Sequence, residues 1–502
     1  MKRSARLRLA ALTAVGGCLL TACSPAADGT GPEDPGTLVL GGVTEPQTLD
    51  LTVTPNASIP SILLGNVYET LVERDQNGAV RPGLASSWDV ERDRRRYVFH
   101  LRQGVKFGNG EPFTARDVVY SFRRVTAAGS RHPFRQQFAA VSGVEARDDR
   151  TVEVNLKRPS NLWLLNLAGP VGVILNEKAV GSLADRPVGT GPFRFDRWDR
   201  GNRIVLARND AYWGPKTQFR SASFRFFNDP NALSNAMLAG ELDIISSVPA
   251  PQSLPQFRSG NAFRVTTGHT NGEVVLGFNE SHPALRDRRV RQAITQAIDR
   301  AALLKTVWAG YGTLIGSMVP PTDPWYEDLS KRLPYDPAAA KRLLQSAGHG
   351  DGLRLRFRVP TRPYATQAAQ FVADQLGRVG VQASMEQVEF PGRWLDEVFT
   401  KGEYDMTLIL HSEPMDIVQY GDPSYYWHYD NAQVRRALAD ADAGTPQEQV
   451  AGMREAARTI ADDAASCWLW LMPNLQVTTK SVTGVPLNVV SGGYELGSIR
   501  KS

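Results

Sequence analysis

The chain has 502 residues, which is long for one domain and predicts two or three folded parts. Its 42% hydrophobic and 22% charged residues are ordinary for a globular protein, and its formal net charge is +5. Lys2, Arg3, Arg6 and Arg8 account for four of these charges, so the rest of the chain is nearly neutral and lacks the basic stripe of a nucleic-acid-binding protein.

The first 22 residues are predicted to be a secretory signal. Behind the four cations, an apolar segment from about Leu9 to Leu20 is too short to span a bilayer. It ends in "LTAC", which resembles the bacterial lipoprotein box. That resemblance implies cleavage before Cys23 and lipidation of its sulfur, which would anchor the protein to the outer face of the cell membrane. The alternative is an ordinary signal peptide with a chance cysteine.

Residues 23–37 are rich in Pro, Gly, Ala and Asp, and we expect a flexible tether. Of the three cysteines, Cys18 would leave with the signal and Cys23 would be modified. Cys467 then remains as one thiol, so no internal disulfide is expected, and it is predicted to be a buried apolar residue.

Beyond the tether, short strands and helices alternate, which indicates a mixed α/β protein. The alternation of apolar residues from Leu353 to Val359 predicts a half-buried strand. The full set of predicted strands is 37–42, 97–101, 151–156, 353–359, 404–410 and 467–472.

Several predicted helices have clear ends. Thr114 and Asp117 form a candidate capping box, and Asp336 followed by Pro337 predicts a helix that stops at Gly348. Apolar residues at helical spacing predict one helix over 290–304. Two more are predicted over 366–380 and 449–465.

Motifs of enzyme chemistry are absent from the sequence. There is no G-x-S-x-G elbow, phosphate-binding loop or H-E-x-x-H motif, and no Cys/His metal spacing. The seven histidines are scattered, although His411 and His428 could approach in space. We therefore predict no enzyme activity, no cofactor and no metal site.

The stretch "GLASSWDVERDRRRYVFHLRQGVKFGNGEPFTARDVVYSFRRV" (83–125) closely resembles the signature region of family 5 extracellular solute-binding proteins. These are the dipeptide-, oligopeptide- and nickel-binding receptors of bacterial ABC importers. The resemblance continues, in the family's order, over 187–198, 205–214, 231–244, 285–300 and 335–348, and it covers essentially residues 38–502.

The resemblance implies an α/β, two-lobed fold like that of periplasmic binding proteins (type II, cluster C), with an extra inserted domain. A solute would bind between the lobes, which close by hinge motion, and the closed monomer would dock on a membrane permease. The implied parts are lobe I over 38–71, 186–276 and 475–502, the inserted domain over 72–185, and lobe II over 277–474.

The resemblance also indicates where a solute would bind. In the family's peptide receptors, an acid after the "YD" strand pairs with the peptide amine. Counting from Tyr404 places Pro414 at that position and His411 where a tryptophan is usual. Glu413 and Asp416 flank the position and are predicted to substitute for the acid.

Aromatic residues cluster just beyond. These residues are Tyr420, Tyr425, Tyr426 and Trp427, and two weaker candidates, Phe390 and Trp394, precede the strand. They either line the cleft or pack against a neighbouring loop. We predict a lipid-anchored receptor for a peptide or a related small, amine-bearing solute. A nickel or metal-complex receptor and, with less support, a secreted hydrolase are the alternatives.

Overall fold

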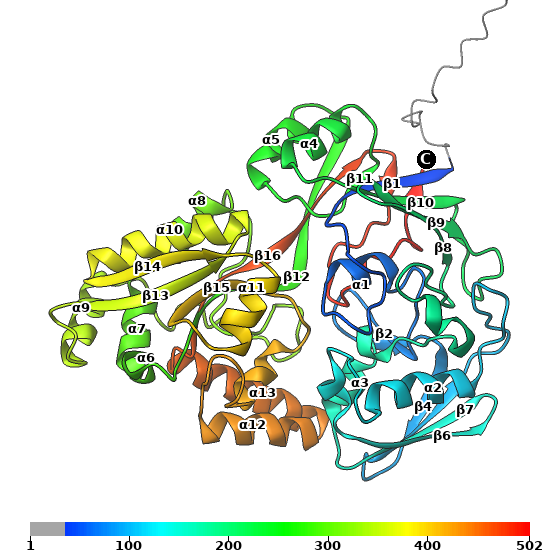
Figure 1. Cartoon of the computed structure of the whole chain (residues 1–502), viewed down its shortest axis with the longest axis horizontal. Coiled ribbons are helices and arrows are strands. Elements are labelled where there is room, and N and C mark those ends of the chain that lie inside the picture. The colour runs from blue at the N-terminus through cyan, green and yellow to red at the C-terminus, as the bar shows by residue number, and fades with distance from the viewer. Residues whose placement is uncertain (1–35) are drawn as a thin grey trace, which may run out of the picture. The chain divides into compact units, whose positions relative to one another are not determined.

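The computed structural model describes residues 36–502, shown in colour in Figure 1. The predicted signal peptide and Cys23 lie outside the described residues. Ten strands form one sheet, in the order β14-β13-β15-β12-β16-β11-β1-β10-β9-β8. Within residues 36–502, no helix combines the length and the apolar character needed to cross a membrane.

One half of this sheet forms the first lobe. β1 pairs in parallel with β10 and β11, and β9 and β8 continue the sheet antiparallel. The strands and helices of this half are β1 (Thr37–Val43), α1 (Ser58–Leu63), β8 (Phe193–Asp199), β9 (Arg203–Arg208), β10 (Ser221–Phe226), α4 (Pro230–Leu238), β11 (Ile244–Ile245), η4 (Pro251–Ser253) and α5 (Leu254–Arg258). The short strands β17 (Val482–Thr483) and β18 (Arg500–Lys501) pair with each other near the C-terminus.

Two long neighbouring strands, β12 (Phe263–Phe278) and β16 (Ser466–Thr479), connect the halves of the sheet. On one side, β16 pairs with the first-lobe strand β11 through Val477 and Thr478, and on the other side β12 pairs with β15 through its C-terminal residues Glu273 to Phe278. The β12–β16 pairing is interrupted between His269 and Glu273, where the register shifts. The proposed lobe boundary at 276/277 falls inside β12.

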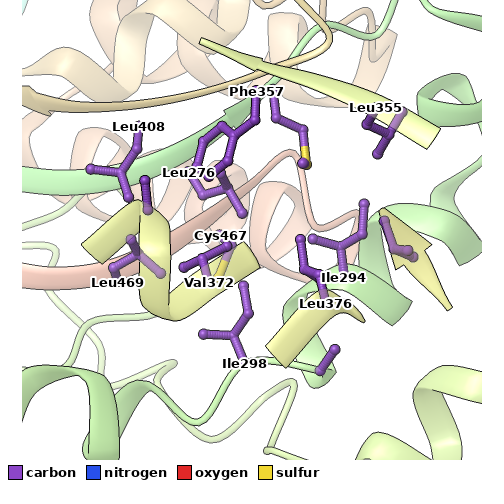
Figure 2. Close-up of a cluster of buried hydrophobic side chains, with 14 of the residues drawn as sticks. Leu276, Ile294, Ile298, Leu355, Phe357, Val372, Leu376, Leu408, Cys467 and Leu469 are labelled. Carbon is purple, nitrogen blue, oxygen red and sulfur yellow. The ribbon is translucent and has the colours of Figure 1, made fainter. Parts of the chain in front are cut away.

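The second lobe packs helices around β13 (Leu353–Pro360), β14 (Val381–Val388) and β15 (Met406–His411). Figure 2 shows part of its core, where Cys467 lies among Leu276, Ile298 and Val372. The helices are α6 (Pro283–Arg286), α7 (Arg288–Gln296), α8 (Arg300–Val307), α9 (Pro337–Ser346), α10 (Pro363–Arg378), α11 (Gly392–Trp394), η5 (Leu395–Thr400), η6 (Asp416–Gly421), α12 (Ala432–Ala443) and α13 (Pro446–Asp462).

Between α1 and β8 the chain forms a separate inserted region with its own core. A four-stranded sheet in the order β4-β5-β7-β6 packs against α2, and β2 pairs with β3. Its elements are β2 (Val72–Arg74), β3 (Val80–Pro82), β4 (Ala85–Val90), β5 (Arg96–Leu101), α2 (Ala115–Thr126), η1 (Arg135–Phe138), β6 (Val141–Asp148), β7 (Thr151–Leu156), α3 (Asn161–Asn166), η2 (Pro170–Gly172) and η3 (Glu177–Ser182).

Most predicted elements are present, including the Thr114–Asp117 capping box and the Asp336 cap. The single helix predicted over 290–304 was wrong, because the chain forms α7 and α8 with a break between them. The break arises at Asp299, whose carboxylate accepts a hydrogen bond from the backbone of Ala302 and so caps a new helix. The helix predicted over 449–465 begins earlier, at Pro446, behind a Thr445–Glu448 capping box.

Candidate functional site

A cavity of about 80 Å³ lies where three parts of the chain meet, and we call it the cleft cavity. It is lined by residues around α1 and near the C-terminus, by the inserted region and by the loop after β15. Its wall is mainly apolar, and residues from each part are Leu51, Asn56, Pro60, Arg74, Phe134, Gln137, Leu165, Asn166, Glu413, Met415 and Ser491. A mainly apolar wall with a few polar side chains is typical of sites that bind small molecules.

A larger cavity of about 340 Å³ adjoins the first, because Arg74, Ala168 and Ser491 line both. We call it the acidic cavity because Glu69, Glu73 and Glu495 line it.

Burial raises the pKa of Glu69 to about 7, although Thr190, Tyr212 and Trp213 donate hydrogen bonds to its carboxylate. Burial, and then the neighbouring Glu69 and Glu495, raise the pKa of Glu73 to about 8. The acidic cavity therefore holds carboxyl groups whose negative charge is disfavoured unless a positive charge approaches.

The loop after β15 presents the predicted amine-binding acids. β15 ends at His411, and Met415 takes a left-handed backbone conformation (φ 70°) before η6 begins at Asp416. Glu413 is partly exposed and lines the cleft cavity. Asp416, only 4% exposed, lies behind the wall and lines neither cavity.

His411, Glu413 and Asp416 lie together, with one N or O atom from each within 4.8 Å of the others. His411 Nδ1 is 3.4 Å from Asp416 Oδ2, and His411 Nε2 is 2.8 Å from the hydroxyl of Tyr426. Burial lowers the pKa of His411 to about 4 and raises the pKa of Asp416 to about 7. Burial, followed by the nearby Asp416, raises the pKa of Glu413.

The predicted aromatic residues pack against one another in or beside the second-lobe core. Tyr420 and Trp427 stack with ring centroids 4.5 Å apart, and both are buried with Tyr426 in the second-lobe core. Tyr425 is half-buried against Trp427. The two weaker candidates, Phe390 and Trp394, contact each other beside the same core. None of these six side chains lines either of the two cavities described above.

Residues of the cavity that sequence reasoning missed include Phe134, Gln137, Leu165 and Asn166 of the inserted region. They lie far from Glu413 in the chain and share no motif with it. His411, Glu413 and Asp416 were predicted near the solute, but not as one group of potential metal ligands. One histidine with two acids at this spacing is not a standard metal-binding motif.

Polar contacts join the inserted region to the second lobe beside the cleft. Arg74 on β2 forms a buried ion pair with Asp323 at 2.7 Å. At the end of α12, Asp442 Oδ1 accepts hydrogen bonds from the Leu162 amide (2.9 Å) and the Ser160 hydroxyl (2.7 Å). Asp442 Oδ2 accepts one from Arg158. Figure 1 shows α12 beside α3, and we call these Asp442 contacts the α12–α3 latch.

Comparison with known proteins identifies the family. The sequence model of bacterial extracellular solute-binding proteins, family 5, matches residues 79–441. The chain belongs to this family. This family 5 chain is 28% identical to di/tripeptide-binding protein 1 of Pseudomonas aeruginosa over 378 residues, 68% of this chain and 70% of that protein. It is 26% identical to a glutathione-binding protein of Salmonella typhimurium over 456 residues, 86% and 88% of the two chains.

Solved structures agree with the fold expected for family 5. The PBP AgaA in complex with agropinic acid, from A. tumefaciens R10, superimposes with a TM-score of 0.82 at 26% identity and covers 93% of this chain and 99% of its own. A periplasmic binding protein of Helicobacter pylori in complex with the peptide STSA gives a TM-score of 0.81 at 24% identity, with 93% and 98% covered. The protein is therefore a two-lobed, extracytoplasmic solute-binding protein and not an enzyme.

Proposed function

We propose that this protein is the receptor of an ABC importer and captures a peptide or a related amine-bearing solute in the cleft cavity. The proposed parts are lobe I over 38–71, 186–276 and 475–502, the inserted domain over 72–185, and lobe II over 277–474. The solute would lie between lobe II and the other two parts, and the closed monomer would deliver it to the permease.

The observation that supports this proposal is the position of Glu413. Its carboxylate is a charged group on a mainly apolar wall, where a solute that covers it would also exclude water. An ammonium group would then form a charge-assisted hydrogen bond in a medium that screens little. Two relatives are named for ligands that contain an amine, one as a di/tripeptide-binding protein and the other as a glutathione-binding protein.

Substitution of Glu413 tests the site. Glu413→Gln keeps the size of the side chain but removes its charge, so we expect the Kd for a bound peptide to rise about tenfold or more. Titration calorimetry with a peptide found by native mass spectrometry of the purified protein measures this change. Glu455→Gln, an exposed acid on α13, is the matched control and should bind as the parent does.

Normal peptide affinity in Glu413→Gln would show that the amine is held elsewhere. A metal complex as the co-purifying species, with no peptide bound from a library, would instead favour the metal-complex receptor.

We also propose that Cys23 carries the lipid that holds the protein at the membrane. The support is the sequence "LTAC" behind a short apolar segment. Cys23→Ser removes the acceptor sulfur, so the protein should appear in the soluble fraction or stay unprocessed. Membrane fractionation with intact-mass measurement tests this, and a mature, membrane-bound Cys23→Ser protein would contradict the anchor.

A further inference from the structure

Three potential metal ligands gather at the end of β15, next to the cleft cavity. His411 offers an imidazole nitrogen, and Glu413 and Asp416 each offer a carboxylate oxygen, all within 4.8 Å of one another. Ligands to Zn²⁺ lie about 2.0–2.2 Å from the ion, so any two are at most about 4.4 Å apart. His411 and Asp416 are already 3.4 Å apart, and the partly exposed Glu413 side chain has room to adjust toward them.

Tyr426 prepares His411 for this role. The Tyr426 hydroxyl lies 2.8 Å from Nε2, so Nε2–H can donate to it and leave the Nδ1 lone pair facing Asp416. Metal-bound histidines commonly donate their second ring N–H to such a partner, which fixes the orientation of the ring. The Tyr426 ring is itself buried in the second-lobe core, and this holds the hydroxyl in place.

Buried acceptors around the cluster provide an independent observation. Among residues 36–502, Asp416 Oδ2 has His411 Nδ1 as a neighbour at 3.4 Å but accepts no hydrogen bond, and Glu273 Oε2 accepts none either. The two residues are 4% and 2% exposed. Glu273 lies directly opposite His411 in the β12–β15 pairing, so both side chains are on the same face of the sheet. Buried carboxylate oxygens that accept no hydrogen bond are uncommon in proteins, and a bound ion is one of the partners that accounts for them.

The neighbouring cation is already committed. Arg74 lines the cleft cavity, but its guanidinium pairs with Asp323 at 2.7 Å. Three carboxyl groups, those of Glu413, Asp416 and Glu273, therefore lie around the single imidazole of His411, and the Arg74 guanidinium is not free to pair with them.

We propose that His411, Glu413 and Asp416 bind one divalent first-row transition-metal ion, such as Zn²⁺, in the wall of the cleft. One nitrogen and two carboxylate oxygens suit such ions, whereas Mg²⁺ prefers oxygen ligands alone. The site consists of the protein's own side chains, so it goes beyond the proposed function and does not depend on which solute is carried. Because Glu413 also lines the cavity, ion and amine compete for the same carboxylate.

Titration of the purified, metal-free protein with Zn²⁺ tests the site. We expect one ion per chain, and at least about tenfold weaker binding in His411→Gln and in Asp416→Asn. A large excess of Mg²⁺ should not displace the ion. The matched control is His428→Gln, which changes an exposed histidine of the same segment and should bind Zn²⁺ unchanged.

A measurement on the unaltered protein covers the case in which a variant does not fold. X-ray absorption at the zinc edge should show one imidazole with oxygen ligands. No stoichiometric Zn²⁺ binding, a spectrum without imidazole, or equal affinity in folded His411→Gln would each overturn the proposal.

Different outcomes test the metal site and the peptide-receptor proposal. Peptide binding without Zn²⁺ binding would remove only the metal site, while Zn²⁺ binding without any peptide would remove only the peptide cargo. Where both bind, added Zn²⁺ should raise the apparent Kd for peptide in the parent protein and leave it unchanged in Asp416→Asn. An equal effect in both proteins would overturn the competition.

Discussion

Glu73 shows how a cavity residue weakens the fold that holds it. Its carboxyl faces Glu69 and Glu495, and its pKa is raised from the ordinary 4.5 to about 8. Between these two values the unfolded chain has released this proton and the folded chain still holds it. The free energy of unfolding therefore falls as the pH rises through this window. Glu73 leaves the stability of the fold undiminished only below about pH 4.5, where its carboxyl is protonated in both states.

Glu73→Gln cannot ionise, so it should remove this part of the pH dependence. We expect the melting temperature of the ligand-free variant to exceed that of the parent near pH 8.5 and to match it near pH 4.5. Thermal unfolding followed by circular dichroism over this range measures the difference. Parallel curves for parent and variant would mean that Glu73 titrates normally, and Glu455→Gln controls for the loss of one charge.

At the scale of elements, the α12–α3 latch joins the second lobe to the inserted region. Asp442 satisfies the Leu162 amide at the start of α3, and Asn161 donates to the carbonyls of Ala441 (2.9 Å) and Gly444 (2.8 Å) at the end of α12. A side chain at the end of each helix thus bonds backbone groups that the end of the other helix leaves without an intrahelical partner. We interpret these contacts as part of the closed arrangement.

Asp442→Ala removes three accepted hydrogen bonds from this contact and should favour opening. The apparent Kd for solute should rise about tenfold, since a change of about 1.4 kcal/mol in the closing equilibrium passes directly into affinity. Calorimetry measures the Kd, and Asp440→Ala, an exposed neighbour on α12, is the control. Unchanged affinity in Asp442→Ala would show that the latch does not contribute to closure.

The elements themselves were predictable where their signals are local. The capping box at Thr114 and the alternation from Leu353 to Val359 each depend on a few adjacent residues, and both predictions hold. The break between α7 and α8 was missed because Ala297 and Ile298 continue the apolar spacing. The Asp299 cap, together with a hydrogen bond from the Asp299 amide to Gln375, ends the first helix despite that pattern.

At the scale of the molecule, the site was only partly predictable. The resemblance pointed to the loop after β15, where the family's spacing gives Pro414 and leaves Glu413 and Asp416 as flanking acids. Of these two acids, Glu413 lines the cleft cavity. The opposite wall, with Phe134 and Asn166, depends on how the inserted region packs, and no local pattern encodes that contact. The Arg74–Asp323 pair, which joins β2 to a loop of the second lobe, is likewise a product of the tertiary fold.

That ion pair gives a test of closure for the molecule as a whole. Arg74→Met or Asp323→Asn alone leaves one buried group without its partner, and opening would return that group to water. Small-angle scattering of the ligand-free protein should show each single variant to be more expanded than the parent, and the double variant to be less expanded than either. Identical profiles for all four proteins would contradict a role in closure.

Cys467 also has a practical use. It is 1% exposed in the second-lobe core and is the cysteine within residues 36–502. A thiol reagent can reach it only when that core transiently opens, and the labelling rate therefore reports the opening free energy of one lobe. Bound solute that stabilises this lobe would slow the labelling, so the protein carries its own chemical probe of occupancy.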